Sequence, residues 1–196
     1  MVIDVINEIK TVLNSLYGIL YDINEPSDII PSLTKQCVDK ILKIDEESLI
    51  IEHKDFGDIE IKYDDVFYKI NIKTQNTSKT YSFPNLISIN RARDFLIKPD
   101  NNLIYIFIEY EQIDSTAKII KIRVQKIESL DWSYLYIQNL GKGQLQIKNM
   151  TQEEFKFNND VTRQEWLEIL KKKGCEYYDN LMLKVVEYKT EWEKDE

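Results

Sequence analysis

Apolar and polar residues follow two different periods along the chain, which predict a mixture of helices and strands. Apolar side chains at helical spacing predict helices over residues 2–20, 32–43, 85–97 and 162–173. Runs of β-branched and aromatic residues predict strands at 48–53, in a hairpin at 58–74, and at 102–111 and 117–127. Gly174 is expected to end the last helix, before a further helix or strand at 177–192.

This order of elements predicts a mixed α/β arrangement in which helices flank a sheet. A chain of 196 residues can bury roughly 70% of its unfolded surface around one core, so we expect a single domain over residues 1–196. The segment 128–149 is rich in turn residues, and a short extended piece is expected after Gly143.

The hairpin at 58–74 carries the strongest indication of function. A two-residue turn at 64–65 would set its register, pairing Ile61 with Tyr68, Glu60 with Lys69 and Asp58 with Asn71. One face would then hold the isoleucines and the other the polar residues. Opposed Cα atoms lie about 4.5–5.5 Å apart, so the oxygens of Asp58 and Asn71 could share a cation. Lys73 would point from the same face toward the oxygen that this cation polarises.

The charge distribution decides between two interpretations of that polar face. The net charge is −8, yet residues 66–98 carry six basic side chains and one acidic side chain. A positive region directly after an acidic site is what a metal centre beside a phosphate backbone requires. The alternative is an ordinary hairpin with one solvated face, in which Glu60 and Lys69 form a cross-strand ion pair.

Several classes of protein are excluded by the composition. His53 is the only histidine, and Cys37 and Cys175 have no CxxC spacing, so zinc sites built from Cys and His and histidine-based triads are ruled out. The sequence contains neither GxGxxG nor GxxxxGK[ST]. The apolar runs are too short to span a membrane, and the first residues do not resemble a secretory signal. We therefore expect a cytoplasmic protein.

The segments "GDIEIK" and "INIKT", followed by the helix in "FPNLISINRARDFL", resemble the PD-(D/E)XK nuclease superfamily. Within it, the chain looks like type II restriction endonucleases of the EcoRV and HincII kind. The resemblance covers roughly residues 1–125 and implies a restriction-endonuclease-like fold with an αβββαβ core. It also implies Mg²⁺-dependent, sequence-specific hydrolysis of double-stranded DNA, and residues 126–196 would then supply recognition and dimerisation elements.

The resemblance implies a role for each polar residue of the hairpin. Asp58 would bind Mg²⁺, and Lys73 would orient or activate the attacking water. Asn71 takes the place of the second acid, where an amide supplies an oxygen ligand but no charge. Glu60 could restore a carboxylate to the metal site. Glu8 on the first helix is a weaker candidate, because the superfamily often lends a glutamate from that helix.

Polar residues outside the hairpin are candidates for DNA contacts. Those of the basic stretch and of the segment around "GKG" are Lys79, Asn85, Arg91, Arg93, Gln138, Asn139, Lys142, Gln144 and Gln146. The three tryptophans, Trp132, Trp166 and Trp192, are expected to anchor a core or an interface instead. Cutting both strands of a palindrome calls for two related sites, which predicts a homodimer. The alternatives are a non-catalytic binding or inhibitor protein on the same fold and a structure-selective DNA nuclease.

Overall fold

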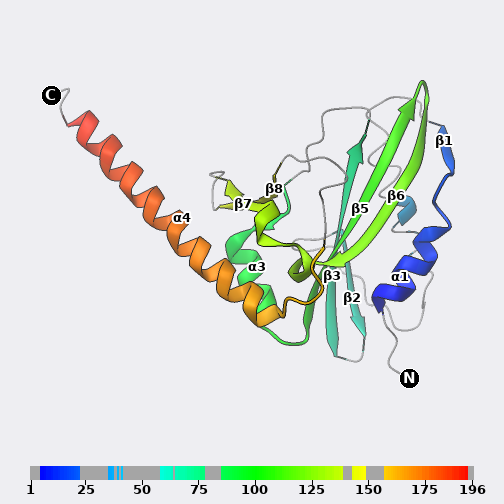
Figure 1. Ribbon diagram of the computed structural model, residues 1–196, viewed down its shortest axis with the longest axis horizontal. Coiled ribbons are helices and arrows are strands. Elements are labelled where there is room, and N and C mark those ends of the chain that lie inside the picture. The colour runs from blue at the N-terminus through cyan, green and yellow to red at the C-terminus, as the bar shows by residue number, and fades with distance from the viewer. Residues whose placement is uncertain are drawn as a thin grey trace.

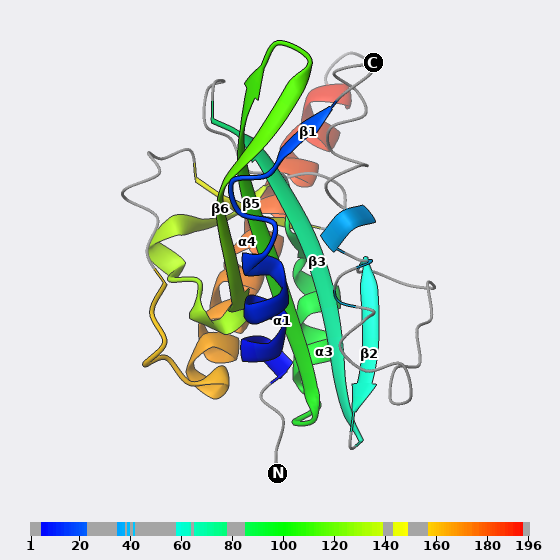
Figure 2. The same cartoon turned by 90° about the vertical axis from the view of Figure 1, so that its right-hand side faces the viewer.

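The computed structural model of the chain describes residues 5–22, 35–37, 39, 41, 58–63, 65–77, 85–138, 143–148 and 157–193. A five-stranded sheet forms the middle layer. Helix α1 (Val5–Asn14) covers one face, and α3 (Ile89–Leu96), α4 (Arg163–Trp192) and a smaller sheet cover the other (Figures 1 and 2). The expected mixed sheet flanked by helices is therefore confirmed.

The main sheet is built around two long parallel strands. Its members, in the order β1-β6-β5-β3-β2, are β1 (Leu20–Asp22), β6 (Thr116–Lys126), β5 (Asn101–Ile113), β3 (Val66–Asn76) and β2 (Ile59–Tyr63). Strands β3 and β5 run parallel and are linked through α3, whereas all other neighbours are antiparallel. Apart from β4 (Ile87–Ser88), which belongs to the smaller sheet, and the helical residues between β1 and β2, the elements α1, β1, β2, β3, α3 and β5 follow the expected αβββαβ order.

A second sheet lies between the main sheet and α4. Its strands, in the order β4-β8-β7, are β4 (Ile87–Ser88), β8 (Gln144–Ile147) and β7 (Leu135–Gln138). Strand β8 follows Gly143, as the sequence predicts. Strand β7 was not predicted, because it is short and lies among turn residues and 3-10 helical turns at Ile127–Ser129 and Trp132–Tyr134.

Each face of the main sheet packs on its own apolar core. The first core joins Ile9 and Leu13 of α1 to the isoleucines of β2, β3 and β5. The second joins the opposite face of β5 to α3, the smaller sheet and the first turns of α4, where Trp166 is fully buried. Strand β5 supplies side chains to both cores and is buried from Asn101 to Tyr110. Burial of both faces identifies β5 as the central strand of the molecule.

Three predicted helix boundaries are wrong. The first helix ends at Asn14, because Gly18 adopts a φ of 75° and turns the chain into β1. The helix expected from residue 85 begins at Ile89, where Ser88 accepts a hydrogen bond from the Arg91 amide as its N-cap. Gly174 does not end a helix, since α4 continues to Trp192.

Two predicted elements lie partly or wholly outside the described residues. The strand expected at 48–53 is outside them. Within the helix expected at 32–43, residues 35–37, 39 and 41 are helical. No helix in the described part of the chain is both long enough and apolar enough to span a membrane.

Candidate functional site

The register of the hairpin matches the prediction. Its five pairs are Ile59 with Ile70, Glu60 with Lys69, Ile61 with Tyr68, Lys62 with Phe67 and Tyr63 with Val66. Asp65 in the turn has a φ of 63°, which the tight turns of two-residue hairpins require. Asp64 lies outside the described residues. The isoleucines consequently face α1, and the polar residues face the side of the sheet that carries α3 and α4.

Asp58 departs from the predicted pairing. The ladder ends at Ile59, so Asp58 is not paired with Asn71. Its backbone amide donates to the Ile70 carbonyl at 2.8 Å, and its carboxylate Oδ2 accepts a 2.6 Å hydrogen bond from the Ile72 amide. Ile72 is the residue between Asn71 and Lys73. The carboxylate is therefore fixed against the backbone of β3, next to both predicted partners.

The Lys73 side chain is half-buried on the polar face of β3. Its pKa depends both on this burial and on the charge of Asp58. Burial lowers the pKa of the Lys73 ammonium below its ordinary value, because the charged form loses hydration. The negative charge of Asp58 acts in the opposite direction and raises that pKa. The charge of Asp58, directly before β2, therefore acts on the ammonium of Lys73 on β3.

Two buried polar groups complete this cluster. Asn71 is paired in register with Tyr105 of β5, and the two residues are 8% and 0% exposed. Asn71 Nδ2 and Tyr105 Oη have no hydrogen-bond partner among the described residues. Burial raises the pKa of the Tyr105 hydroxyl, and the charge of Asp58 raises it further. Tyr105 therefore belongs to the site, although its position within an apolar run gave no sign of this.

The polar face of the sheet is buried at the end beyond Lys73. Gln75 of β3 and Glu109 of β5 are paired there, and Glu109 is buried completely. The Glu109 carboxylate forms an ion pair with Arg123 of β6. The second apolar core covers this face, so these polar groups must be satisfied within the protein or by a ligand.

Glu60 and Glu8 lie apart from the cluster. The Glu60 carboxylate forms a 2.6 Å ion pair with Lys69, whose ammonium lies 5.4 Å from the Phe95 ring centroid. This is the ion pair of the ordinary-hairpin alternative. Glu8 is exposed on α1, which covers the opposite face of the sheet. No three acidic, histidine or cysteine side chains converge anywhere in the described part of the chain.

The oxygen ligands at the site suit Mg²⁺ bound together with a phosphate. The Ile72 amide occupies Oδ2 of Asp58, so Oδ1 is the oxygen that a cation would take. The amide of Asn71 leaves a buried donor without an acceptor, and the opposite amide orientation would present Oδ1 there instead. Mg²⁺ is commonly held by one or two carboxylates, several waters and the phosphates of its substrate. The donor set fits this pattern.

The basic candidates of the stretch after the hairpin lie on or near α3. Arg91 lines an open pocket of about 450 Å³ together with Lys69, Phe95 and Lys98. Arg93 is bound to its neighbour Asp94 by a 2.7 Å ion pair. Lys79 lies outside the described residues.

The amide-bearing candidates gather on the smaller sheet. Gln138 and Gln144 are paired across β7 and β8. The Gln146 side chain donates to Asn85 and accepts from the Tyr136 hydroxyl, so it joins β8 to the segment before α3. Asn139 and Lys142 are outside the described residues.

No protein-family model matches the chain, and no curated protein matches it. Among solved structures, the NlaIV restriction endonuclease matches at 12% sequence identity and a TM-score of 0.41, over 88% of this chain and 85% of that chain. A TM-score of 0.41 does not establish a common fold. A function can therefore be inferred only from the residues of this chain.

Proposed function

We propose that the chain is a Mg²⁺-dependent endonuclease that hydrolyses phosphodiester bonds in double-stranded DNA, in the manner of a type II restriction enzyme. The hydrogen bond that holds the Asp58 carboxylate against the Ile72 amide, between Asn71 and Lys73, carries this proposal. A carboxylate directly before β2 and an ammonium group on β3, beside buried amide and hydroxyl groups that have no partner among the described residues, suit a phosphate and its cation.

Each residue of the cluster has a separate task in this proposal. Asp58 and Asn71 would hold Mg²⁺, which supplies neutralisation of phosphate charge and assistance in deprotonating water. Lys73 donates from its ammonium to the oxygens that gain charge in the transition state. Tyr105 acts as a positioning residue for Asn71, because the two buried residues are paired across β3 and β5. Glu60 has no task here, because Lys69 neutralises it.

Contacts with DNA fall to two separate surfaces in the proposal. Three basic side chains, those of Lys69, Arg91 and Lys98, and one acidic side chain, that of Asp94, line a pocket near the turn end of the hairpin, where a phosphate backbone could lie. The amide side chains of the smaller sheet, with Asn85 and Gln146 in contact, are donors and acceptors suited to base edges. Residues 1–125 would thus supply catalysis, and residues 126–196 recognition and dimerisation.

A non-catalytic binding protein is the second candidate, and one observation favours it. The cluster holds one carboxylate, and an amide stands where the resemblance implies a second acid. Loss of the second acid weakens the affinity for a divalent cation. A structure-selective nuclease would use the same residues as the first candidate and would differ only in the DNA that it cuts.

Incubation of the protein with plasmid and phage DNA in Mg²⁺ tests the proposal. Lys73→Ala should abolish the discrete fragments that the wild type produces. Lys62→Ala is the matched control, because Lys62 is in the same hairpin but forms an exposed ion pair with Asp65. No cleavage of any duplex in Mg²⁺ or Mn²⁺ by the wild type would instead support the binding protein. Preferential cutting of branched DNA would support the structure-selective nuclease.

A further inference from the structure

The second half of α4 extends away from the body of the protein (Figure 1). Over residues 179–193, every side chain is exposed except that of Leu181, which is half-buried. This segment nevertheless carries large apolar side chains, namely Met182, Leu183, Val185, Val186, Tyr188 and Trp192. Trp192 is 80% exposed. Large exposed apolar side chains gathered on one segment are typical of an interaction site.

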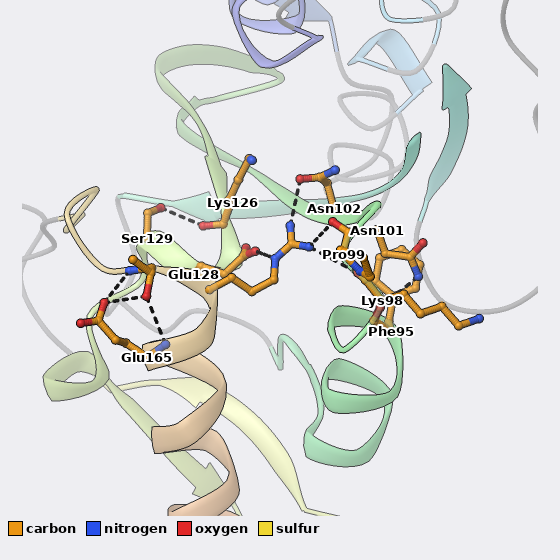
Figure 3. Close-up of polar contacts among 11 residues, drawn as sticks. Phe95, Lys98, Pro99, Asn101, Asn102, Lys126, Glu128, Ser129 and Glu165 are labelled. Atoms are coloured by element: carbon orange, nitrogen blue, oxygen red, sulfur yellow. Dashed lines mark hydrogen bonds and ion pairs between the residues drawn. The ribbon is translucent and has the colours of Figure 1, made fainter. Parts of the chain in front are cut away.

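The first half of α4 holds this arm in a fixed direction. Arg163 bonds to Glu128 at 2.7 Å, to the Pro99 carbonyl at 2.7 Å and to Asn102 at 3.0 Å (Figure 3). Farther along, the Tyr178 hydroxyl accepts a 2.8 Å hydrogen bond from Asn90 of α3. Residues 179–193 then continue for roughly 20 Å at 1.5 Å per residue. The arm is therefore presented by a helix that is anchored along its first half.

Apolar residues on the arm follow the spacing of a coiled-coil seam. Leu181, Val185, Tyr188 and Trp192 are separated by four, three and four residues. This alternation keeps one stripe of side chains facing a partner helix. Lys184 and Glu191 lie seven residues apart, each directly before a seam residue, so they occupy the same flank of the stripe.

The charges on the flanks distinguish between the two possible orientations of a partner helix with the same sequence. In a parallel pair, Lys184 would face the partner's Lys189, which places like charges together twice. In an antiparallel pair, the flank that carries Lys184 and Glu191 lies against the same flank of the partner helix, which runs in the opposite direction. Lys184 therefore faces the partner's Glu191. The two-fold axis then repeats this attractive pair.

We propose that the arm of α4 binds the arm of a second copy of this chain in an antiparallel coiled coil. Val185 packs with the partner's Tyr188, and Leu181 packs with the partner's Trp192. The partner's Glu193 then lies beside Asn180, near the point where α4 extends away from the rest of its own chain. The overlap consequently covers the whole exposed arm. This inference rests on the dimerisation that the proposed function assigns to residues 126–196, and its interface uses none of the hairpin residues.

Sedimentation equilibrium tests the seam, with the full chain compared with two variants that each replace one of two neighbouring valines. Val185 and Val186 are 59% and 61% exposed, so aspartate at either position should leave the fold of the monomer intact. We expect a wild-type dimer, and Val185→Asp should raise its dissociation constant on the order of a hundredfold. Val186→Asp, off the seam, should leave it nearly unchanged. A monomeric wild type, or equal effects of the two variants, would overturn the proposal.

Exchange of the flanking charges tests the orientation. Lys184→Glu and Glu191→Lys should each weaken the dimer roughly tenfold, because each replaces two attractive pairs with two repulsive pairs. The double variant should recover the wild-type dissociation constant. A stronger dimer in Lys184→Glu would indicate a parallel pair and would contradict the antiparallel arrangement.

Discussion

The backbone amide of Ile72 donates a 2.6 Å hydrogen bond to the carboxylate of Asp58, fourteen residues earlier in the chain. This bond ties the first acidic residue of the hairpin to the strand segment that holds Asn71 and Lys73. The bond is not part of the pairing between β2 and β3, because that pairing ends at Ile59, one residue after Asp58. The geometry of the site therefore depends on a side chain that bonds to the backbone, and its electrostatics depend on the charge of Asp58.

Asn71→Asp should make the stability of the protein more dependent on Mg²⁺. Without metal, a second buried carboxylate close to Asp58 should lower Tm, because like charges destabilise each other in a buried site. With Mg²⁺ the two carboxylates share a cation, and the concentration needed for half-saturation should fall roughly tenfold. Thermal unfolding over a range of Mg²⁺ concentrations measures both effects.

Gln75→Glu provides the control for Asn71→Asp. Gln75 is buried on the same strand but lies farther from Asp58, in register with Glu109. Its replacement should lower Tm without any gain from Mg²⁺. An identical response of the two variants to Mg²⁺ would show that Asn71 has no special relationship to a cation.

Lys73 should lose its proton below the ordinary pKa of a lysine. Burial disfavours the ammonium, so its pKa lies below the ordinary value of 10.5. The folded protein thus binds this proton less tightly than the unfolded chain, which lowers the free energy of unfolding at every pH below the pKa of Lys73 in the folded protein. This loss of stability shrinks as pH rises through that pKa and is absent above 10.5, where both states have lost the proton. NMR titration of lysines labelled with ¹³C at Cε measures the pKa directly.

Removal of the Asp58 charge provides the second half of the titration experiment. Asp58→Asn should lower the pKa of Lys73 further, because the carboxylate is the group that raises it. Cleavage should also decline with rising pH as Lys73 loses its proton. If Lys73 titrated like an exposed lysine in both proteins, the proposed coupling would be wrong.

The parts of the structure that depend on local sequence were predictable. The turn of the hairpin fixed its register, and the β-branched runs placed β5 and β6 within a few residues of their observed bounds. Burial of the polar face was not predictable, because α3 and α4 reach it from far along the chain. The inclusion of Tyr105 in the site likewise depends on the parallel pairing of β3 and β5.

Gly174 and Gly143 should respond in opposite directions to alanine. Gly174 lies inside α4, and an added Cβ would be 3.7 Å from Ile89, which is an ordinary contact. Gly174→Ala should increase the free energy of unfolding by about 0.5–1 kcal/mol through its helix propensity. The predicted helix end at Gly174 was wrong because glycine, although common at helix ends, lies here within α4.

Gly143→Ala should destabilise the protein. Gly143 has a φ of 73°, and an added Cβ would lie 3.0 Å from the Tyr177 ring. The expected loss is about 1–3 kcal/mol from the backbone conformation and the contact together. Urea unfolding of the two variants beside the wild type checks both signs. Stabilisation by Gly143→Ala would contradict the observed turn.

Arg123→Met should destabilise the protein far more than Lys121→Met on the same strand. Arg123 forms the ion pair with the fully buried Glu109, whereas Lys121 is exposed. Removal of the arginine takes a counter-ion from a fully buried carboxylate, which costs about 3–5 kcal/mol. Equal urea midpoints for the two variants would show that the polar face is open to water.

The rate of plasmid cleavage by Asp58→Asn, measured across Mg²⁺ concentrations, tests the central claim most directly. Asparagine retains an oxygen that can accept the Ile72 hydrogen bond, so the hairpin should keep its geometry and the protein its Tm. Loss of the charged ligand should lower the rate by about a thousandfold or more. A variant that cuts DNA at the wild-type rate, with the same Mg²⁺ dependence, would contradict the proposed site.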